Sequence, residues 1–233
     1  MHGNLEPPNL NRDATSQGLA LWLGTPAAQN YFDPAALNDA DRARLPGHRN
    51  SRRQQEFKVS RALQVFAGTG AAHSLSHSGG YAALLTAPSE MRIGVDLEVA
   101  RPRDVLRTAR FAFSKQEVDA LEARSGVARD ELFYALWTMK EALAKALRLE
   151  LVDALRQCVF TPGAVTWGGT APTRSPWSVQ VFQPRPGFFL AAACIGTDIR
   201  PSPELWEWPP RQAANWPITA VAAAPATAAA APA

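Results

Sequence analysis

Two carboxylates interrupt an apolar, strand-like segment at residues 93–98, IGVDLE. Side chains two apart in a strand point to the same face, so Asp96 and Glu98 are expected to lie side by side. Two like charges at that separation repel and raise each other's pKa unless a cation lies between them. A metal ion is the simplest such cation, and the pair therefore predicts a metal site. The alternative is that both acids mark the exposed end of a strand.

A second segment, WTMKEALAK at residues 137–145, offers further charged groups. Glu141 and Lys145 are four residues apart and are therefore neighbours on one face of a helix. If that helix faces the strand, a third carboxylate and an ammonium group join the first pair. The alternative for Glu141 and Lys145 is an ordinary helix-surface ion pair, which contributes only about 0.2–0.5 kcal/mol.

Three motifs, taken in their order along the chain, carry a resemblance to a known family. They are Ser76-His77-Ser78, Gly94-Val95-Asp96-Leu97-Glu98 and Trp137-x-x-Lys140-Glu141-x-x-x-Lys145. Together they resemble the signature set of the 4'-phosphopantetheinyl transferases, in particular the longer, single-chain type related to surfactin synthetase activators. The resemblance is densest from about Leu75 to Phe160. It implies transfer of 4'-phosphopantetheine from coenzyme A to a serine of an apo carrier protein, with release of adenosine 3',5'-bisphosphate.

The resemblance assigns roles to the acids and to the lysine. Asp96, Glu98 and Glu141 are the expected ligands of Mg²⁺, which prefers an oxygen shell of one or two carboxylates with substrate phosphates and water. Lys145 is expected to bind coenzyme A by steadying the phosphoryl oxygens and the leaving group. Glu141 is the expected catalytic base, acting on the attacking hydroxyl directly or through a water on the metal. The sequence does not distinguish these two routes.

Hydroxyl and basic side chains upstream are the candidates for binding the phosphates of coenzyme A. Ser76 and His77 lie beside a predicted hairpin turn, where a hydroxyl and an imidazole are natural phosphate donors. The related transferases supply basic groups to the 3'-phosphate from a helix and the segment before it, which points to Arg44, Arg53 and Arg61. The chain lacks the family's usual Gly-Lys-Pro stretch ahead of the serine–histidine motif. The sequence therefore leaves open how the adenine end is held.

A basic stretch narrows the class of partner. Between residues 39 and 61 the chain carries seven Lys or Arg residues against three acids, within a formal net charge of +3 and a pI near 9.1. Such a stretch suits an anionic partner. No helix-turn-helix signature or zinc-finger spacing accompanies it, so we expect no nucleic acid. The phosphates of a small ligand fit better, as does an acidic acyl, peptidyl or aryl carrier domain steered to a basic rim.

The composition is that of a soluble globular protein. With 46% hydrophobic residues among 233, the chain can bury the core of one large domain or two small ones. No apolar run approaches about eighteen residues and no secretion signal is recognisable, which predicts a cytoplasmic protein without a membrane span. We expect it to be a monomer. Cys158 and Cys194 lack metal-type spacing with histidine and lie in apolar, strand-like surroundings, which predicts buried reduced thiols.

Hydrophobic periodicity predicts strands and helices in the same chain. The expected strands cover residues 19–23, 74–78, 81–85, 93–98, 177–182 and 188–195, and the expected helices begin near residues 39, 49, 114 and 130. Residues 201–217, with three tryptophans among prolines, are expected to wrap over the body without forming a regular helix. From Ala220 onward the Ala/Pro-rich sequence is expected to be disordered.

The resemblance implies an α+β fold of two similar, pseudo-twofold halves. Each half is expected to be an antiparallel sheet packed with helices, with the ligand in a cleft between them and the join close to Met91. The chain then divides into a flexible lead-in at residues 1–17, an N-terminal half at 18–91, a C-terminal half with the metal site at 92–200, and a tail at 201–233.

Two non-catalytic alternatives stay open at this point. In one, the arginine-rich segment holds nucleic acid and the acids are surface decoration. In the other, the chain is a diverged relative that binds coenzyme A without transferring it. The missing Gly-Lys-Pro stretch permits the second alternative, whereas the intact acids and Lys145 argue against it.

Overall fold

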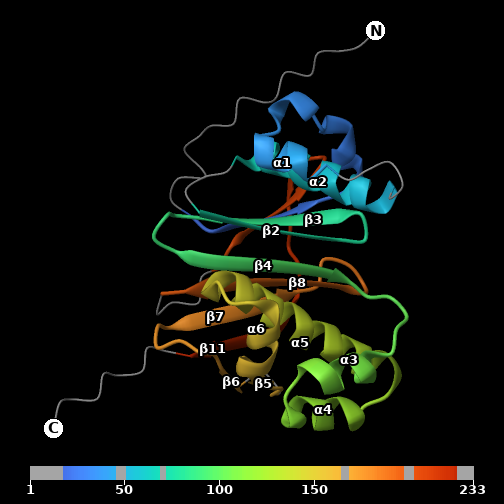
Figure 1. Ribbon diagram of the computed structural model, residues 1–233, viewed down its shortest axis with the longest axis vertical. Helices are drawn as coiled ribbons and strands as arrows, with labels where there is room; N and C mark the ends of the chain where they lie inside the picture. Colours follow the sequence, from blue (N-terminus) through green and yellow to red (C-terminus); the bar gives the residue numbers. More distant parts are fainter. Residues whose placement is uncertain (1–17, 46–50, 69–71, 164–167, 197–201, 225–233) are drawn as a thin grey trace, which may run out of the picture.

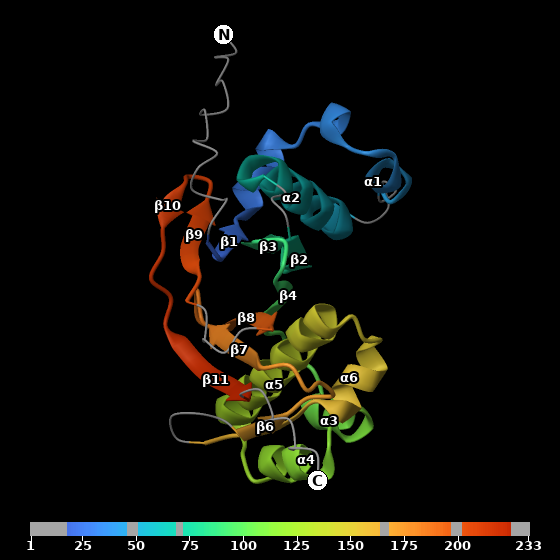
Figure 2. The ribbon, with the colours of Figure 1, turned by 90° about the vertical axis from the view of Figure 1, so that its left-hand side faces the viewer.

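The described part of the computed structural model comprises residues 18–45, 51–68, 72–163, 168–196 and 202–224. Figures 1 and 2 show four layers stacked along the longest axis: helices, a first sheet, a second sheet and further helices. The predicted α+β class, with sheets packed against helices, is confirmed. The predicted lead-in at residues 1–17 and the end of the tail at 225–233 lie outside the described residues. Within those residues, no helix is both long and apolar enough to cross a bilayer.

The first sheet has five strands in the order β10-β9-β1-β3-β2. Their bounds are β1 Ala20–Gly24, β2 Ala72–Ser78, β3 Tyr81–Ala87, β9 Glu204–Trp208 and β10 Gln212–Ala213. Gly79 and Gly80, both at positive φ, form the tight turn between β2 and β3, as predicted. Helix α2, Ser51–Ala67, covers the outer face of this sheet and buries Val59 and Leu63 against it.

Short helices precede α2 on the same side. They are η1 Pro26–Tyr31, η2 Pro34–Ala36 and α1 Asp39–Ala43. Asn38 caps α1, because its side-chain oxygen accepts a hydrogen bond from the backbone N–H of Asp41 at 2.8 Å.

The second sheet has four antiparallel strands in the order β11-β7-β8-β4. Their bounds are β4 Arg92–Val99, β7 Trp177–Phe182, β8 Phe188–Ile195 and β11 Ile218–Ala224. The long helix α5, Gly126–Leu147, packs across the outer face of β4 and β8. The remaining elements are α3 Val105–Ala112, α4 Lys115–Glu122, α6 Leu151–Gln157 and a small hairpin of β5 Val159–Thr161 with β6 Gly168–Thr170.

Successive side chains of β4 point to opposite faces of the sheet, and only those on one face can contact α5. Val95 and Leu97 point into the apolar layer between the two sheets, where they are fully or almost fully buried. The even-numbered residues of β4 lie on the opposite face and therefore face α5. Gly94 belongs to this set, and a Cβ there would lie only 2.0 Å from the carbonyl oxygen of Ala142. The absence of a side chain lets strand and helix approach closely, which brings Asp96 and Glu98 next to α5.

The C-terminal segment joins both sheets, and it is the largest difference from the sequence prediction. Figure 2 shows it passing from β9 and β10 in the first sheet to β11 in the second. β9 runs parallel to β1, an exception to the expected antiparallel sheets. A parallel neighbour requires a long connection, and β9 pairs with β1 only after β4, β7 and β8 of the second sheet have been passed along the chain.

The disorder predicted from Ala220 onward is wrong for the start of that stretch. β11 pairs with β7 as far as Ala224, and Ala220 and Ala222 are buried in the same core cluster as Val179 and Val181 of β7. Small side chains at alternate positions fit this crowded face. Two tryptophans anchor the segment on the first sheet and α2: Trp206 stacks on Trp22 and Trp208 stacks on Phe66.

Both cysteines are free and buried, as predicted. Burial raises the pKa of the Cys158 thiol to about 11 and that of Cys194 to about 12. Because the thiolate is the reactive form, neither is suited to act as a nucleophile.

Candidate active site

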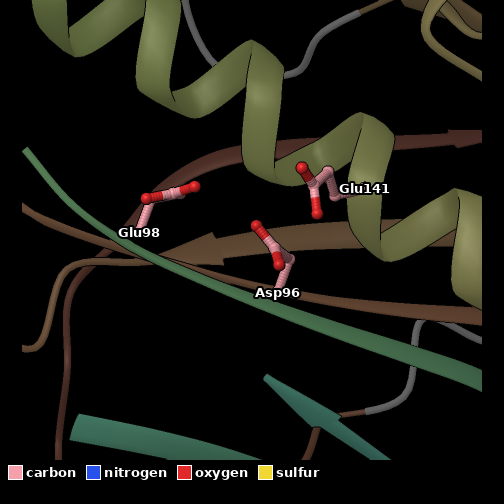
Figure 3. A group of neighbouring side chains, drawn as sticks. All are labelled: Asp96, Glu98 and Glu141. Atoms are coloured by element: carbon pink, nitrogen blue, oxygen red, sulfur yellow. The ribbon is translucent and has the colours of Figure 1, made fainter. Parts of the chain in front are cut away.

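Three carboxylates converge on the face of β4 that packs against α5. One oxygen from each of Asp96, Glu98 and Glu141 lies within 4.8 Å of the other two. Figure 3 shows Asp96 and Glu98 rising from the strand and Glu141 descending from the helix toward them. Asp96 is 3% exposed, and the two glutamates are partly buried. The structure thus brings together the three residues that the sequence proposed as metal ligands.

Lys145 adds one positive charge to this cluster, called the acid cluster below. It lies one helical turn after Glu141, and its Nζ donates hydrogen bonds to Asp96 Oδ1 at 3.0 Å and to the carbonyl oxygen of Val95 at 2.8 Å. The side chain is 34% exposed, so the ammonium group is held at the strand but remains accessible. Glu141 and Lys145 are therefore more than a surface ion pair, because both face β4.

β4 is the edge strand of the second sheet, and serines from β2 lie against that edge. Ser76 Oγ donates to Asp96 Oδ1 at 2.8 Å, and Ser78 Oγ donates to Glu98 Oε2 at 3.2 Å. Ser74 Oγ accepts a hydrogen bond from the backbone N–H of Val95 at 3.0 Å. This serine row (Ser74, Ser76 and Ser78) links the two sheets and fixes the two strand carboxylates. The sequence predicted Ser76 as a phosphate donor, and that role stays a prediction.

We expect Ser76→Ala to weaken divalent metal binding by about tenfold, because hydrogen bonds to a ligating carboxylate orient it toward the metal. The measurement is a titration with Mn²⁺, followed by electron paramagnetic resonance, in the presence of coenzyme A. Ser74→Ala is the matched control, since the Ser74 hydroxyl bonds a backbone N–H and no carboxylate. Equal losses in the two variants, or no loss in Ser76→Ala, would contradict the assignment.

The mutual repulsion of the acids appears in their pKa values. Burial, and then the charge of Asp96, raise the pKa of Glu141 from 4.5 to about 8, although Lys145 acts in the opposite direction. Burial and Asp96 also raise the pKa of Glu98. Without a bound cation, at least one of these groups therefore holds a proton at neutral pH.

We expect the metal-free protein to lose stability as the pH rises from about 4.5 to 8. In that window the folded state holds a proton on Glu141 that the unfolded chain has released, so deprotonation favours unfolding. The melting temperature in EDTA should fall by several degrees between pH 6 and pH 8.5. Glu141→Gln, whose amide does not titrate, should show a weaker fall. An identical pH dependence in both proteins would argue against the raised pKa.

The donor set fits a hard divalent cation. All three groups are carboxylates, and oxygen is the ligand atom that Mg²⁺ prefers. Asp96 Oδ2 is buried and has no hydrogen-bond partner among the described residues, so a ligand for it is missing from the protein itself. Three carboxylates and one ammonium group also leave an excess of negative charge that a divalent ion would offset. The residues present therefore fit the metal that the sequence predicted.

His77 lies on the other face of β2 from the serine row, as alternation requires. Its Nδ1 is 3.5 Å from Glu56 Oε2 on α2, and Glu56 Oε1 accepts hydrogen bonds from the backbone N–H of Gly80 and from Arg52 Nε, both at 3.3 Å. The imidazole is half exposed, so its Nε2 edge can reach a ligand. The sequence analysis missed Glu56, because nothing local marks a helix residue as the partner of a strand histidine.

The three arginines predicted to bind the 3'-phosphate all lie on α1 and α2. Arg44 is the C-cap of α1, and Arg53 is exposed in the first turn of α2. Arg61 is paired with Asp41 at 2.9 Å, and it borders a hollow of about 290 Å³ that is lined also by Asp33. Their role in ligand binding stays a prediction.

Trp137 and Lys140 have structural roles. Trp137 stacks on Phe133. Lys140 is fully buried: its Nζ lies 2.9 Å from Glu117 Oε2 and donates to the carbonyl oxygen of Leu155 at 2.7 Å. Lys140 is therefore paired with an acid in the core. Glu117 also completes a capping box with Ser114 at the start of α4.

A comparison with known proteins bears on the same region. A family model described as the 4'-phosphopantetheinyl transferase superfamily matches residues 92–192, which contain the acid cluster and Lys145. This part of the chain is similar to the 4'-phosphopantetheinyl transferase superfamily. The predicted resemblance is confirmed, including the likeness to the longer, single-chain type.

Curated members of the superfamily show the same relationship. The 4'-phosphopantetheinyl transferase Sfp of Bacillus subtilis is 30% identical over 129 residues, which are 54% of this chain and 55% of the relative. The 4'-phosphopantetheinyl transferase HetI of a Nostoc species is 30% identical over 149 residues, 61% of this chain and 59% of the relative. AcpT of Salmonella typhi is 42% identical over 80 residues, 34% of this chain and 41% of the relative. The matches thus span 41% to 59% of these relatives.

Proposed function

We propose that this protein transfers the 4'-phosphopantetheine group of coenzyme A to a serine hydroxyl of an apo carrier protein and releases adenosine 3',5'-bisphosphate. The observation that carries the proposal is the convergence of Asp96, Glu98, Glu141 and Lys145 between β4 and α5. The similar proteins support it, because each is named as a 4'-phosphopantetheinyl transferase.

Mg²⁺ is the proposed metal, and Asp96, Glu98 and Glu141 would hold it. When bound together with the diphosphate of coenzyme A, such an ion neutralises charge on the phosphoryl oxygens. The protein's own part is to supply fixed oxygens. The serine row orients Asp96 and Glu98 before any ligand arrives, which reduces the reorganisation needed on binding.

Proton transfer is the proposed task of Glu141. In the reaction a bond forms between the carrier serine Oγ and the β-phosphorus of coenzyme A, and the bond from that phosphorus to the bridging diphosphate oxygen breaks. The serine proton has to leave, and the Glu141 carboxylate, which reaches from α5 toward Asp96 and Glu98, is the proposed acceptor. Whether Glu141 acts directly or through a water stays open.

Lys145 is proposed to stabilise the departing adenosine bisphosphate. Its ammonium group is fixed by Val95 and Asp96 at the border of the acid cluster. A preorganised cation at the leaving oxygen contributes more than a mobile one, because no dipoles have to reorient during the reaction. The cytoplasmic location and the monomeric state predicted from the sequence stay predictions.

The decisive experiment is incubation of the protein with coenzyme A, Mg²⁺ and a panel of apo acyl, peptidyl and aryl carrier proteins. We expect at least one carrier to gain the mass of phosphopantetheine, and EDTA to prevent the gain. Tight, salt-dependent DNA binding with no transfer would favour the nucleic-acid alternative. Binding of coenzyme A with no transfer to any carrier would favour the inactive-relative alternative.

A further inference from the structure

Arg185 lies in the loop between β7 and β8, yet its side chain reaches the first sheet. Its Nη2 forms an ion pair with Oε1 of Glu207 in β9. The guanidinium also lies over two aromatic rings, 5.4 Å from the ring centroid of Tyr81 on β3 and 5.8 Å from that of Phe188 on β8. The two rings contact each other edge to face, with centroids 4.9 Å apart. These four residues, called the clamp below, join the start of β8 to two strands of the first sheet.

The backbone that carries Arg185 is tied to the end of β4. The carbonyl oxygen of Arg185 accepts a hydrogen bond from the backbone N–H of Phe188 at 3.0 Å, which closes the loop. The carbonyl oxygen of Gly187 accepts one from the N–H of Ala100, the residue after β4, at 2.7 Å. The base of the Arg185 side chain is therefore fixed relative to β4, and its guanidinium holds the first sheet.

The strand registers place the clamp at the Glu98 end of the acid cluster. Tyr81 is the partner of Ser78 in the hairpin of β2 and β3, and Phe188 is the partner of Val99 in the pair of β4 and β8. Ser78 Oγ donates a hydrogen bond to Glu98 Oε2 and accepts one from the N–H of Val99, both at 3.2 Å. The clamp thus connects the strand neighbours of the two residues that meet at this hydroxyl.

The seam between β2 and β4 depends on side chains. The two strands belong to different sheets, so serine hydroxyls cross the seam in place of a backbone ladder. At 3.2 Å the bond from Ser78 to Glu98 is already longer than a typical bond between two oxygens, and such bonds weaken steeply as their geometry worsens. A small movement of the hairpin away from β4 would therefore release the Glu98 carboxylate.

Arginine suits this position better than another cation. A guanidinium is planar, so it can stack on an aromatic ring while its edge pairs with a carboxylate. Arg185 Nη1 is buried and has no hydrogen-bond partner among the described residues, so the ring faces are its favourable contacts. Glu207 is fixed on the other side, because Trp206 and Trp208 next to it stack on aromatic residues of β1 and α2.

We propose that Arg185 is a positioning residue for the acid cluster, which holds the hairpin of β2 and β3 against the end of β4 and so keeps Ser78 within hydrogen-bond distance of Glu98. The proposal rests on the proposed function, in which Glu98 is a metal ligand. Because Arg185 acts through Tyr81 and Ser78, its loss should weaken the metal site without removing a group that takes part in the reaction.

The test is a double-mutant cycle on metal affinity, in which the full chain is titrated with Mn²⁺ in the presence of coenzyme A and followed by electron paramagnetic resonance. Ser78→Ala should weaken Mn²⁺ binding by about tenfold, because a ligating carboxylate loses its hydrogen bond. Arg185→Gln should weaken it by about threefold to tenfold. The double variant should match Ser78→Ala within about twofold, because the hydroxyl through which Arg185 acts is already missing. Losses that multiply in the double variant would overturn the proposal.

Arg110→Gln is the matched control, because it removes an arginine–glutamate pair that is exposed and joins α3 to α4. Its affinity for Mn²⁺ should equal that of the wild type. Arg185→Lys keeps the charge opposite Glu207 but not the planar stack, so its affinity should lie between those of Arg185→Gln and the wild type. If Arg185→Gln does not fold, the same cycle is measured with Arg185→Lys.

Transfer at saturating Mn²⁺ separates positioning from a structural defect. The rate of Arg185→Gln should then return to within about twofold of the wild type, since the metal ligands themselves are intact. A rate that stays low at saturation would overturn the proposal, as would wild-type Mn²⁺ affinity in Arg185→Gln beside a weakened Ser78→Ala. Either outcome leaves the proposed function standing. A wild type that neither binds Mn²⁺ nor modifies any carrier would overturn both proposals.

Discussion

Replacing Asp96 with asparagine is expected to lower phosphopantetheine transfer by at least about a thousandfold while the fold stays intact. Asp96 is the central acid: it is almost fully buried, it accepts hydrogen bonds from Ser76 and Lys145, and its Oδ2 has no partner among the described residues. An amide keeps the shape and the hydrogen bond from Ser76 but removes the negative charge. The measurement is the rate at which an apo carrier gains mass under saturating coenzyme A and Mg²⁺.

The stability of the same variant separates a functional from a structural role. In the metal-free state Asp96 raises the pKa of both Glu98 and Glu141, which means that the three charges repel one another. Removal of one buried charge should therefore leave the melting temperature in EDTA unchanged or higher. Asp119→Asn is the control, since Asp119 is an exposed partner of Lys115. Transfer at more than about a tenth of the wild-type rate in Asp96→Asn would refute the metal site.

Much of the acid cluster could be predicted from local sequence, because the side chains of a strand and of a helix each return to the same face after a few residues. The period of two in a strand places Asp96 beside Glu98, and the spacing of four in a helix places Glu141 beside Lys145. What the two periods do not say is whether strand and helix meet. Gly94 supplies that information, since only a position without a side chain allows the observed approach to Ala142.

The contacts that the sequence did not predict join elements far apart in the chain. Ser76 and Asp96 belong to different sheets, and they meet because the edge strand β2 lies against the free edge of β4. The row of serines at every second position was visible as a pattern, but its partner was not. The same holds for His77 and Glu56, which meet only because α2 packs on the first sheet.

The C-terminal strands were missed for a compositional reason. Residues from Ala220 to Ala224 consist almost entirely of alanine and lack the alternation of polar and apolar residues that marks a half-buried strand. Their pairing with β7 depends on a free strand edge that tertiary structure provides. Alanine-rich sequence therefore resembled a tail here, although it forms the outer strand of the second sheet.

Lys145→Met is expected to reduce transfer by about a hundredfold to a thousandfold without weakening metal binding. The lysine contacts Asp96 and Val95, and its ammonium group borders the acid cluster. Methionine keeps the length of the side chain but removes the charge that would stabilise the leaving group. Steady-state kinetics with an apo carrier should show the loss mainly in kcat.

Metal binding distinguishes this role from a merely structural one. Without Lys145 the acid cluster is more negative, so its affinity for Mn²⁺ should stay equal or rise, whereas a collapsed site would lose it. Lys145→Arg retains the charge and should recover part of the rate, although a planar guanidinium cannot reproduce both hydrogen bonds of the ammonium group. Lys115→Met, at an exposed helix pair with Asp119, serves as the control and should transfer normally. If Lys145→Met turns over as fast as this control, the leaving group is stabilised by other residues and the role assigned to Lys145 is wrong.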